Sequence, residues 1–339
     1  MWSRIESWLK ARLAFHPRLW RVARAARRRL RFSRRESPTH TWDERVAGVE
    51  SGVSRGWLDW ELIEVEHIRP QVSGDPRLSY LEHFISTHLR ELPQHRALSL
   101  GCGGGNLERA LIAMGAVREI DAYDSSPESI RLARELADAA NLGSRISYHV
   151  ADLNHAEWPP AAYDFAVAKM ALHHIKGLEH LYEQVGRALR PGGLLMFNEF
   201  VGPSLFQWTD LQLGLANSIL ELMPERQRRL APLPRFERPT VREMIEEDAT
   251  EAVRSSEILL LLERSFEILE IRPYGGTLLN LVLTHLMPTF SLDNPEQLSL
   301  VRLLFLFERT LVEHRVLPSD FAYVVARPRE HRGSHASSP

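Results

Sequence analysis

The sequence predicts an α/β fold: a doubly wound, mostly parallel sheet of seven strands with helical additions before and within it. Two observations favour this fold class. From residue 96 onward, short apolar runs alternate with helical stretches, and a turn with four glycines follows the first run. The composition fits a folded globular chain, because 339 residues with 44% apolar and 25% charged side chains can bury a sizeable core.

The strands and helices follow in order along the chain. Strands are expected at 96–100, 119–123, 145–150, 165–169, 194–199, 266–274 and 320–328. Helices are expected at 107–114, 127–140 and 179–189, the last ended by the sequence RPGG. Such alternation is typical of a parallel sheet with helices on both faces.

The remaining segments divide the chain into domains. Residues 37–92 are expected to form a helical cap, and residues 93–328 the main domain, with helical insertions at about 203–255 and 283–316. The end, residues 329–339, is polar, consists largely of small residues, and is predicted to be disordered.

The first 36 residues form a basic arm. Residues 1–35 hold twelve Arg or Lys against the single acid Glu6, whereas the whole chain has a formal net charge of −2, so the rest is acidic. Trp2, Ile5 and Leu9 share one helical face, a pattern that allows contact with an anionic membrane surface or a partner. A solvated tail packed on the acidic body and a mitochondrial presequence are the alternatives.

Compartment and membrane class follow from simple counts. The sequence has no run of about 18 uncharged apolar residues, so no membrane-spanning helix is expected. Cys102 is the only cysteine, which excludes an intramolecular disulfide and a thiolate metal site. A cytoplasmic location is predicted, with peripheral attachment at the inner face of a membrane as the further possibility raised by the arm.

The turn ALSLGCGGGNL (97–107) carries the strongest local signal. Glycines let a ligand approach the backbone, and the helix that follows offers free N–H groups. Asn106 stands where the dinucleotide fingerprint requires glycine, and no Lys-Ser or Lys-Thr follows, so a phosphate-binding P-loop is excluded. Asp124, nineteen residues beyond Gly105 at the end of the second strand, can accept both hydroxyls of a ribose.

Five segments in a fixed order give a resemblance to a known family. They are SLGCGGGN, IDAYDSS, VADLN, YDFAVAKMALHHI and ALRPGGLLMFNEF, within roughly residues 92–201. This set resembles the class I S-adenosylmethionine-dependent methyltransferases, which have a Rossmann-like fold. Further segments resemble a subgroup of bacterial methyltransferases, some of whose relatives occur with polysaccharide-biosynthesis proteins.

The resemblance implies a cofactor site for S-adenosylmethionine. The glycines would wrap its methionine part, Asp124 would hold the ribose, and Asp152 with Leu153 would contact adenine. The implied set is Ser99, Gly101, Cys102, Gly103, Gly105, Asp124, Ser125, Asp152, Leu153, Lys169 and Met170. One position departs from the family, which usually has an acid two residues before the first glycine; Ser99 cannot offer a charge to the methionine ammonium.

Candidate catalytic residues follow the fourth and fifth strands. His173 or His174 is expected to act as a general base near its ordinary pKa, with His174 the weaker choice. Glu199 is expected to orient a substrate hydroxyl, to hold the histidine, or to cap a helix. Because no second carboxylate has suitable spacing, no metal site is predicted here.

Asn198, Gln207 and Trp208 are expected to line the substrate pocket or a lid, although packing is the common role of aromatic residues at such positions.

The predicted function is methyl transfer to a small-molecule or glycan acceptor, at a hydroxyl oxygen. A nucleic-acid methyltransferase is one alternative. The fourth strand, however, ends in AKMALHH and not in the Asp/Asn-Pro-Pro-aromatic motif, and an acidic body repels nucleic acid. A non-catalytic partner protein that keeps the fold is the other alternative, which Ser99 favours and the intact glycine turn opposes.

Overall fold

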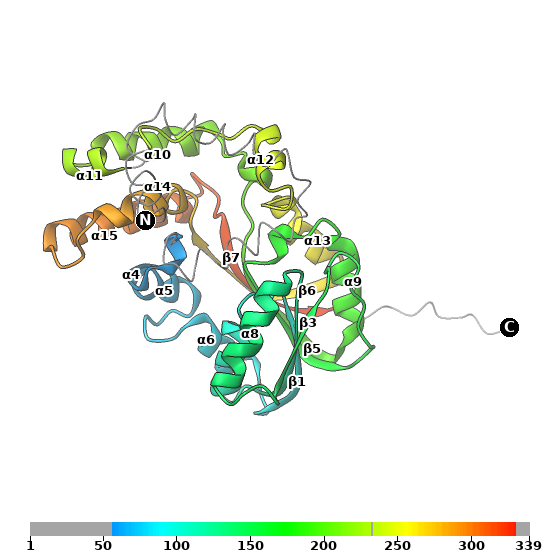
Figure 1. The fold of residues 1–339 in the computed structure, drawn as a ribbon. Coiled ribbons are helices and arrows are strands. Elements are labelled where there is room, and N and C mark those ends of the chain that lie inside the picture. Colours follow the sequence, from blue (N-terminus) through cyan, green and yellow to red (C-terminus); the bar gives the residue numbers. More distant parts are fainter. Residues whose placement is uncertain (1–55, 232, 330–339) are drawn as a thin grey trace, which may run out of the picture.

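The computed structural model describes residues 56–231 and 233–329. Within them, seven strands form one sheet in the order β3-β2-β1-β4-β5-β7-β6 (Figure 1). The strands are β1 (Gln94–Leu100), β2 (Val117–Asp124), β3 (Ile146–Val150), β4 (Tyr163–Lys169), β5 (Leu189–Phe200), β6 (Phe266–Gly275) and β7 (Phe321–Pro328). The first five are parallel, and β7 is antiparallel to both of its neighbours. The predicted mostly parallel, seven-stranded α/β fold is confirmed.

Both faces of the sheet are buried, as the alternation along β1 shows. Ala97 belongs to the hydrophobic core on one face, whereas Leu98 and Leu100 belong to a second core on the other face. The first core includes residues of α7 (Asn106–Ala113) and α8 (Pro127–Ala139), and the second includes residues of α9 (Leu178–Ala188) and α13 (Ile258–Ser265). Parallel strands need this two-sided cover, because their crossover helices lie on the faces.

One strand boundary was predicted wrongly. β5 begins at Leu189, not at residue 194, and the sequence RPGG lies within it rather than ending a helix. Tyr163 pairs with Leu189 while Phe165 pairs with Leu194, so an irregular stretch in β5 accommodates the extra residues. Gly192 has a φ of +81°, which makes this departure from regular strand geometry possible.

The described part of the predicted cap is helical. It contains α4 (Glu61–Ile63), a π turn (Glu64–Ile68), α5 (Arg69–Val72) and α6 (Tyr80–His88). A capping box between Ser79 and Glu82 begins α6, because each side chain binds the backbone N–H of the other residue. The arm (1–36), residues 37–55 of the cap and residues 330–339 of the tail lie outside the described residues, so the domain division stays a prediction.

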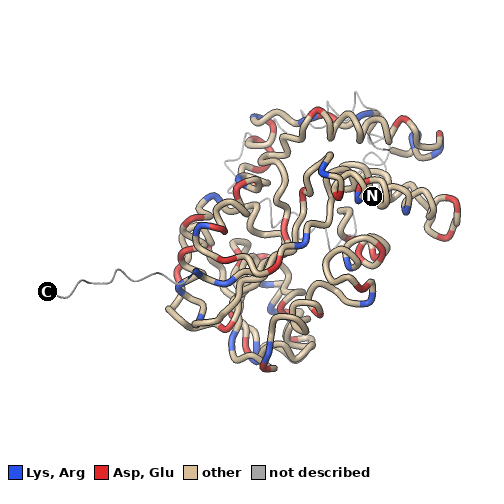
Figure 2. The backbone as a smooth tube through the Cα atoms, turned by 180° about the vertical axis from the view of Figure 1, so that it is seen from behind, with Lys and Arg blue, Asp and Glu red and all other residues tan. Residues whose placement is uncertain are grey.

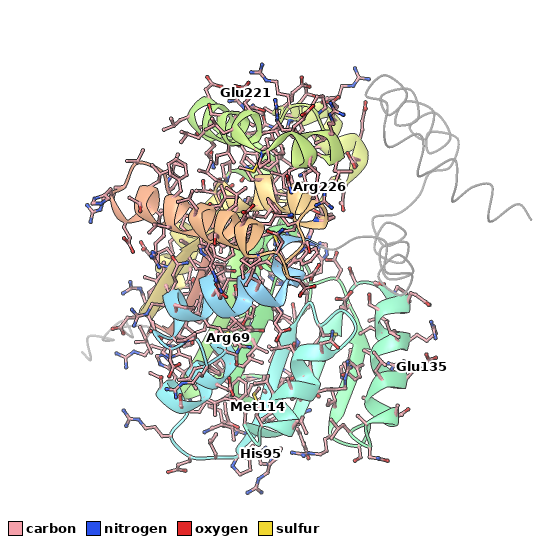
Figure 3. The ribbon with its side chains drawn as sticks, turned by 90° about the vertical axis from the view of Figure 1, so that its left-hand side faces the viewer. Arg69, His95, Met114, Glu135, Glu221 and Arg226 are labelled. Atoms are coloured by element: carbon pink, nitrogen blue, oxygen red, sulfur yellow. The ribbon has the colours of Figure 1, made fainter. Side chains whose placement is uncertain are left out.

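The insertions supply further helices: α10 (Asp210–Leu222), α11 (Glu225–Leu230), α12 (Val241–Glu247), α14 (Leu279–Leu286) and α15 (Pro295–Glu313). The second insertion begins earlier than the predicted residue 283. Figure 3 places Glu221 of α10 and Arg226 of α11 at the end of the molecule opposite His95, where β1 begins. The first insertion therefore lies at the end toward which the parallel strands run.

Charged residues of both signs are interspersed along the described backbone (Figure 2). Across residues 56–231 and 233–329, the structure contains no helix with the length and apolar character that a membrane crossing requires.

Candidate active site

The strand order reverses beside β1, because the chain passes outward through β2 and β3 and then returns to β4 on the other side of β1. In open α/β sheets, ligands bind at the carboxyl ends of the strands at such a reversal. Three predicted site segments meet at this edge: the glycine turn (101–105) after β1, Asp124 at the end of β2, and the short turn η3 (Leu172–His174) after β4.

The glycine turn has the backbone conformation that only glycine adopts easily. Gly101, Gly103 and Gly105 have φ values of +69°, +50° and +76°. A Cβ atom at Gly101 would lie 2.4 Å from the Cβ of Ala171, and one at Gly105 would lie 2.3 Å from the hydroxyl oxygen of Tyr148. A Cβ at Gly103 would meet nothing within 4 Å. The turn is thus packed at its two ends and leaves space beside its middle residue for a ligand.

Asp124 connects the end of β2 to the glycine turn. Its Oδ2 accepts a hydrogen bond from the Gly103 N–H at 2.9 Å, and its Oδ1 accepts one from the Ser126 N–H at 2.9 Å. Ser125 lies half-buried between these contacts.

Burial raises the pKa of the Cys102 thiol well above its ordinary value, so this cysteine stays protonated at neutral pH.

A carboxylate that the sequence analysis missed lies behind the glycine turn. Ser99 donates a hydrogen bond to Oε1 of Glu108, and both side chains are fully buried. Oε2 of Glu108 has no hydrogen-bond partner among the described residues. Burial raises the pKa of Glu108 to about 7, although the bond from Ser99 favours its charged form.

The carboxyl group beside Ser99 therefore comes from the first turn of α7. Two features of the sequence could have revealed this. Ser99 stands where an acid was expected, and Glu108 lies in the first turn of the following helix, where the helix dipole favours negative charge.

The two residues predicted at the adenine differ in exposure. Asp152 is exposed after β3; its Oδ1 accepts a hydrogen bond from the Asn154 N–H at 2.9 Å, and its Oδ2 lies 3.0 Å from Nδ1 of His155. Leu153 is buried in the core beside α9. Only Asp152 of this pair borders solvent with a polar group.

Two residues, Lys169 at the end of β4 and Met170 directly after it, lead into the turn η3, and the backbone of Met170 is strained. Lys169 is exposed, and its ammonium lies 5.6 Å from the ring centre of Tyr80 on α6. Met170 has a φ of +51°, and its N–H donates to the Asn198 carbonyl oxygen at 2.9 Å. A positive φ in a residue other than glycine is uncommon and is found preferentially at functional sites. The side chain of Asn198 accepts a hydrogen bond from the buried hydroxyl of Tyr274, so it is occupied within the sheet.

Glu199 fixes the turn η3. Its carboxylate is fully buried at the end of β5, and Oε2 accepts the N–H groups of Ala171 and Leu172, each at 2.7 Å. Oε1 accepts the Phe200 N–H at 2.7 Å and is hydrogen-bonded to Nδ1 of His173. Four donors thus occupy the two carboxyl oxygens of Glu199. These bonds hold His173 and cap the turn, which are two of the three roles predicted for Glu199.

His173 lies between two carboxylates that favour its protonated form. Burial alone would lower its pKa, but Glu199 on one side and Glu251 on the other raise the pKa to about 10. Oε1 of Glu251 lies 3.6 Å from Nε2 of His173. The raised pKa favours the protonated imidazole at neutral pH and therefore a role in holding the turn, whereas the role of general base stays a prediction.

His174 is the neutral member of the pair. Burial and the charge on His173 lower its pKa to about 4. Its Nδ1 lies 3.2 Å from the Thr250 carbonyl oxygen, so Nδ1 carries the proton and Nε2 the lone pair. The pKa shifts favour His174 over His173 as a proton acceptor, and a catalytic role for either histidine stays a prediction.

The sequence argument against a metal here also needs correction. Glu251 comes from the first insertion and supplies the second carboxylate, and donor atoms of His173, His174 and Glu251 lie within 4.8 Å of one another. In the structure these residues form a charge-paired hydrogen-bond network, with His173 between Glu199 and Glu251.

The predicted lid residues are occupied within the insertion. Nε2 of Gln207 donates to the Pro239 carbonyl oxygen at 2.8 Å, and Trp208 stacks on Phe206 with ring centres 5.3 Å apart. These contacts correspond to the packing role, and both residues stay half-buried, so a substrate contact remains a prediction.

Comparisons with known proteins agree with this geometry. Residues 97–193 match the family model described as a methyltransferase domain. A ubiquinone biosynthesis O-methyltransferase of Idiomarina loihiensis is 29% identical over 157 residues, which cover 46% of this chain and 59% of that protein. A 27-O-demethylrifamycin SV methyltransferase of Amycolatopsis mediterranei is 30% identical over 108 residues, 31% of this chain and 39% of that protein. The matched segments thus span less than two thirds of either relative.

Solved methyltransferase structures are also similar to this chain. An S-adenosylmethionine-dependent methyltransferase from Mesorhizobium loti has a TM-score of 0.43 at 19% identity, covering 73% of this chain and 97% of that one. The matched domain lies across the glycine turn, Asp124 and the turn after β4, so residues 97–193 form a class I S-adenosylmethionine-dependent methyltransferase domain.

Proposed function

We propose that the protein transfers the methyl group of S-adenosylmethionine to a hydroxyl oxygen of a small molecule. One observation carries this proposal: the glycine turn and the histidine turn touch, because a Cβ at Gly101 would lie 2.4 Å from the Cβ of Ala171. The segment that would bind the cofactor therefore adjoins the segment with His173 and His174. Two relatives bear names that describe O-methylation in ubiquinone biosynthesis and methylation of a demethylrifamycin.

The chain's residues fit the cofactor. The open space beside Gly103 accommodates a ligand against the backbone, and Asp124 presents a carboxylate for ribose hydroxyls. Glu108 places behind the turn a buried carboxyl oxygen that has no hydrogen-bond partner among residues 56–231 and 233–329, and negative charge there favours the cationic methionine end. S-adenosylmethionine, when bound, supplies a methyl group on a sulfonium centre.

The protein's own part is alignment, exclusion of water and removal of a proton. The cofactor held at the glycine turn would supply the methyl group for the acceptor oxygen, and Nε2 of His174 would accept the proton that the acceptor hydroxyl loses. The His173–Glu199–Glu251 network keeps the turn in place, and a fixed geometry alone can supply several kcal/mol. A base with a pKa near 4 is weak, so alignment is the larger contribution.

Label transfer tests the proposal. The full-length protein is incubated with methyl-labelled S-adenosylmethionine and a host extract, and small-molecule, lipid, polysaccharide and nucleic-acid fractions are separated. We expect label in the small-molecule fraction and its loss in Asp124→Ala. Label in the polysaccharide fraction would identify a glycan acceptor, and label in nucleic acid would contradict the proposal. Absence of label together with absence of cofactor binding by calorimetry would favour a non-catalytic partner protein.

The basic arm supports an additional proposal, that residues 1–35 hold the protein at an anionic membrane surface. Removal of these residues is expected to abolish binding to vesicles containing anionic lipid and to leave cofactor affinity unchanged. Equal vesicle binding by the full and shortened chains would contradict the proposal.

A further inference from the structure

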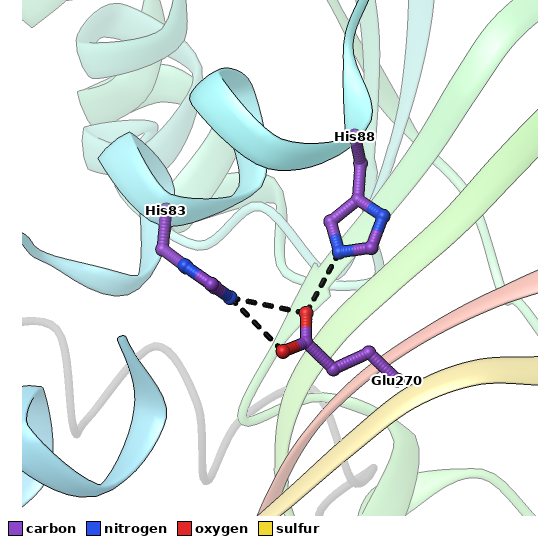
Figure 4. A group of neighbouring side chains, drawn as sticks. All are labelled: His83, His88 and Glu270. Carbon is purple, nitrogen blue, oxygen red and sulfur yellow. Dashed lines mark hydrogen bonds and ion pairs between the residues drawn. The ribbon is translucent and has the colours of Figure 1, made fainter. Parts of the chain in front are cut away.

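A second cluster of metal-binding side chains lies away from the candidate active site. It consists of His83 and His88 of α6 and Glu270 of β6 (Figure 4). Nε2 of His83 lies 3.1 Å and 3.0 Å from the two carboxyl oxygens of Glu270, and Nε2 of His88 lies 2.7 Å from Oε2. Two imidazole nitrogens and one carboxylate thus point toward one another from segments far apart in the sequence.

We propose that His83, His88 and Glu270 form a binding site for Zn²⁺ or a similar divalent transition metal. Two histidines and one carboxylate form a recognised ligand set for zinc, with a fourth position left for water. Tetrahedral zinc at about 2.0–2.1 Å from each ligand separates its donor atoms by about 3.3 Å. The nitrogen–oxygen distances of 2.7–3.1 Å reach that separation after shifts of only a few tenths of an ångström.

The surroundings prepare the ligands. Nδ1 of His83 lies 3.4 Å from the hydroxyl oxygen of Thr87, which can accept a hydrogen bond from a protonated Nδ1 and so leave the Nε2 lone pair for a metal. The side chains of His83, His88 and Glu270 are 11%, 14% and 11% exposed. A metal ion could therefore reach the site and still be largely shielded from water.

Arg272 has two opposing effects on this site. Its Nε donates to Oε1 of Glu270 at 2.7 Å and so orients the carboxylate, leaving Oε2 toward the histidines. Its positive charge also repels a cation, so metal affinity is expected to be moderate. The bound metal would fasten the end of α6 to the edge strand β6, and α6 begins at Tyr80, whose ring lies under Lys169 at the candidate active site.

Zinc titration of the full-length protein, freed of metal by a chelator, tests the inference. We expect one Zn²⁺ per chain by calorimetry and metal analysis, and a rise in melting temperature with added Zn²⁺. His88→Gln keeps an N–H donor for Glu270 but is a poor zinc ligand, so it should lower the affinity at least tenfold. The exposed His95→Gln is the matched histidine control and should bind Zn²⁺ as the wild type does.

Arg272→Gln provides a test in which all three proposed metal ligands stay in place. Removal of the competing charge should tighten Zn²⁺ binding severalfold, the opposite of the His88→Gln effect. If the three residues form only a hydrogen-bonded bridge, Zn²⁺ will not bind at one per chain, or its binding will be the same in His88→Gln, Arg272→Gln and the wild type. Either result would overturn the inference, and neither depends on methyl transfer.

Discussion

At the scale of single residues, the clearest feature is that a carboxyl group expected on β1 is supplied by α7 instead. Ser99 stands at the end of β1 where related proteins usually have an acid, and Glu108 reaches the same place from α7. We predict that Glu108→Gln weakens binding of S-adenosylmethionine about tenfold or more, because interactions with a charged group contribute about 1.5–3 kcal/mol. Calorimetry measures the affinity.

A ligand control and a compensating variant make this prediction specific. 5′-Methylthioadenosine lacks the amino-acid part of the cofactor, so its affinity should not change in Glu108→Gln. The double variant Ser99→Asp/Glu108→Ala returns the acid to β1 and should recover most of the lost affinity. An equal loss for both ligands would show that Glu108 only supports the fold of the turn.

At the scale of elements, the sequence predicted the sheet well because each strand is a short apolar run bounded by turn residues. It failed where tertiary contacts decide. The start of β5 at Leu189 depends on pairing with β4, and Glu251 reaches His173 from a segment distant in the sequence. The protonation of His173 follows from that second carboxylate, so spacing alone could not reveal it.

The contact between the glycine turn and the histidine turn gives a prediction at the same scale. Gly101→Ala and Gly103→Ala both force a side chain into positive φ, at a cost of about 1–2 kcal/mol. Only the alanine at position 101 also meets Ala171. We expect Gly101→Ala to lower the free energy of unfolding more than Gly103→Ala, and the double variant Gly101→Ala/Ala171→Gly to recover part of the loss. Urea unfolding without cofactor checks this, and a failure of Ala171→Gly to help would refute the contact.

At the scale of the whole molecule, buried carboxyl groups join the helical cover to the sheet. Glu308 of α15 accepts the N–H groups of Gly276, Leu278 and Leu279 at 2.5–2.8 Å. Asp320, just before β7, accepts a hydrogen bond from Nε2 of Gln212 on α10 at 3.0 Å. The other carboxyl oxygen of Asp320 has no hydrogen-bond partner among the described residues. These contacts connect both insertions to the strands beneath them.

The same acids make the stability of the fold depend on pH in an unusual direction. Burial raises the pKa of both groups to about 7, and the charge of Glu308 contributes to the shift of Asp320. In the unfolded chain the pKa of each group is about 4. Between roughly pH 4 and 7 the folded chain therefore binds more protons at these two groups than the unfolded chain does. The free energy of unfolding should therefore fall as pH rises through this window, by up to about 4 kcal/mol for a group whose pKa is three units higher.

Asp320→Asn tests this dependence. The amide keeps an oxygen for the hydrogen bond from Gln212 but carries no charge, so the variant should lose less stability than the wild type between pH 5 and 8. Urea unfolding at each pH measures the difference, and Glu221→Gln on the exposed face of α10 is the matched surface control. Parallel pH profiles for the wild type and Asp320→Asn would mean that Asp320 is charged in the folded state without cost. The attachment of the cover would then not depend on its protonation.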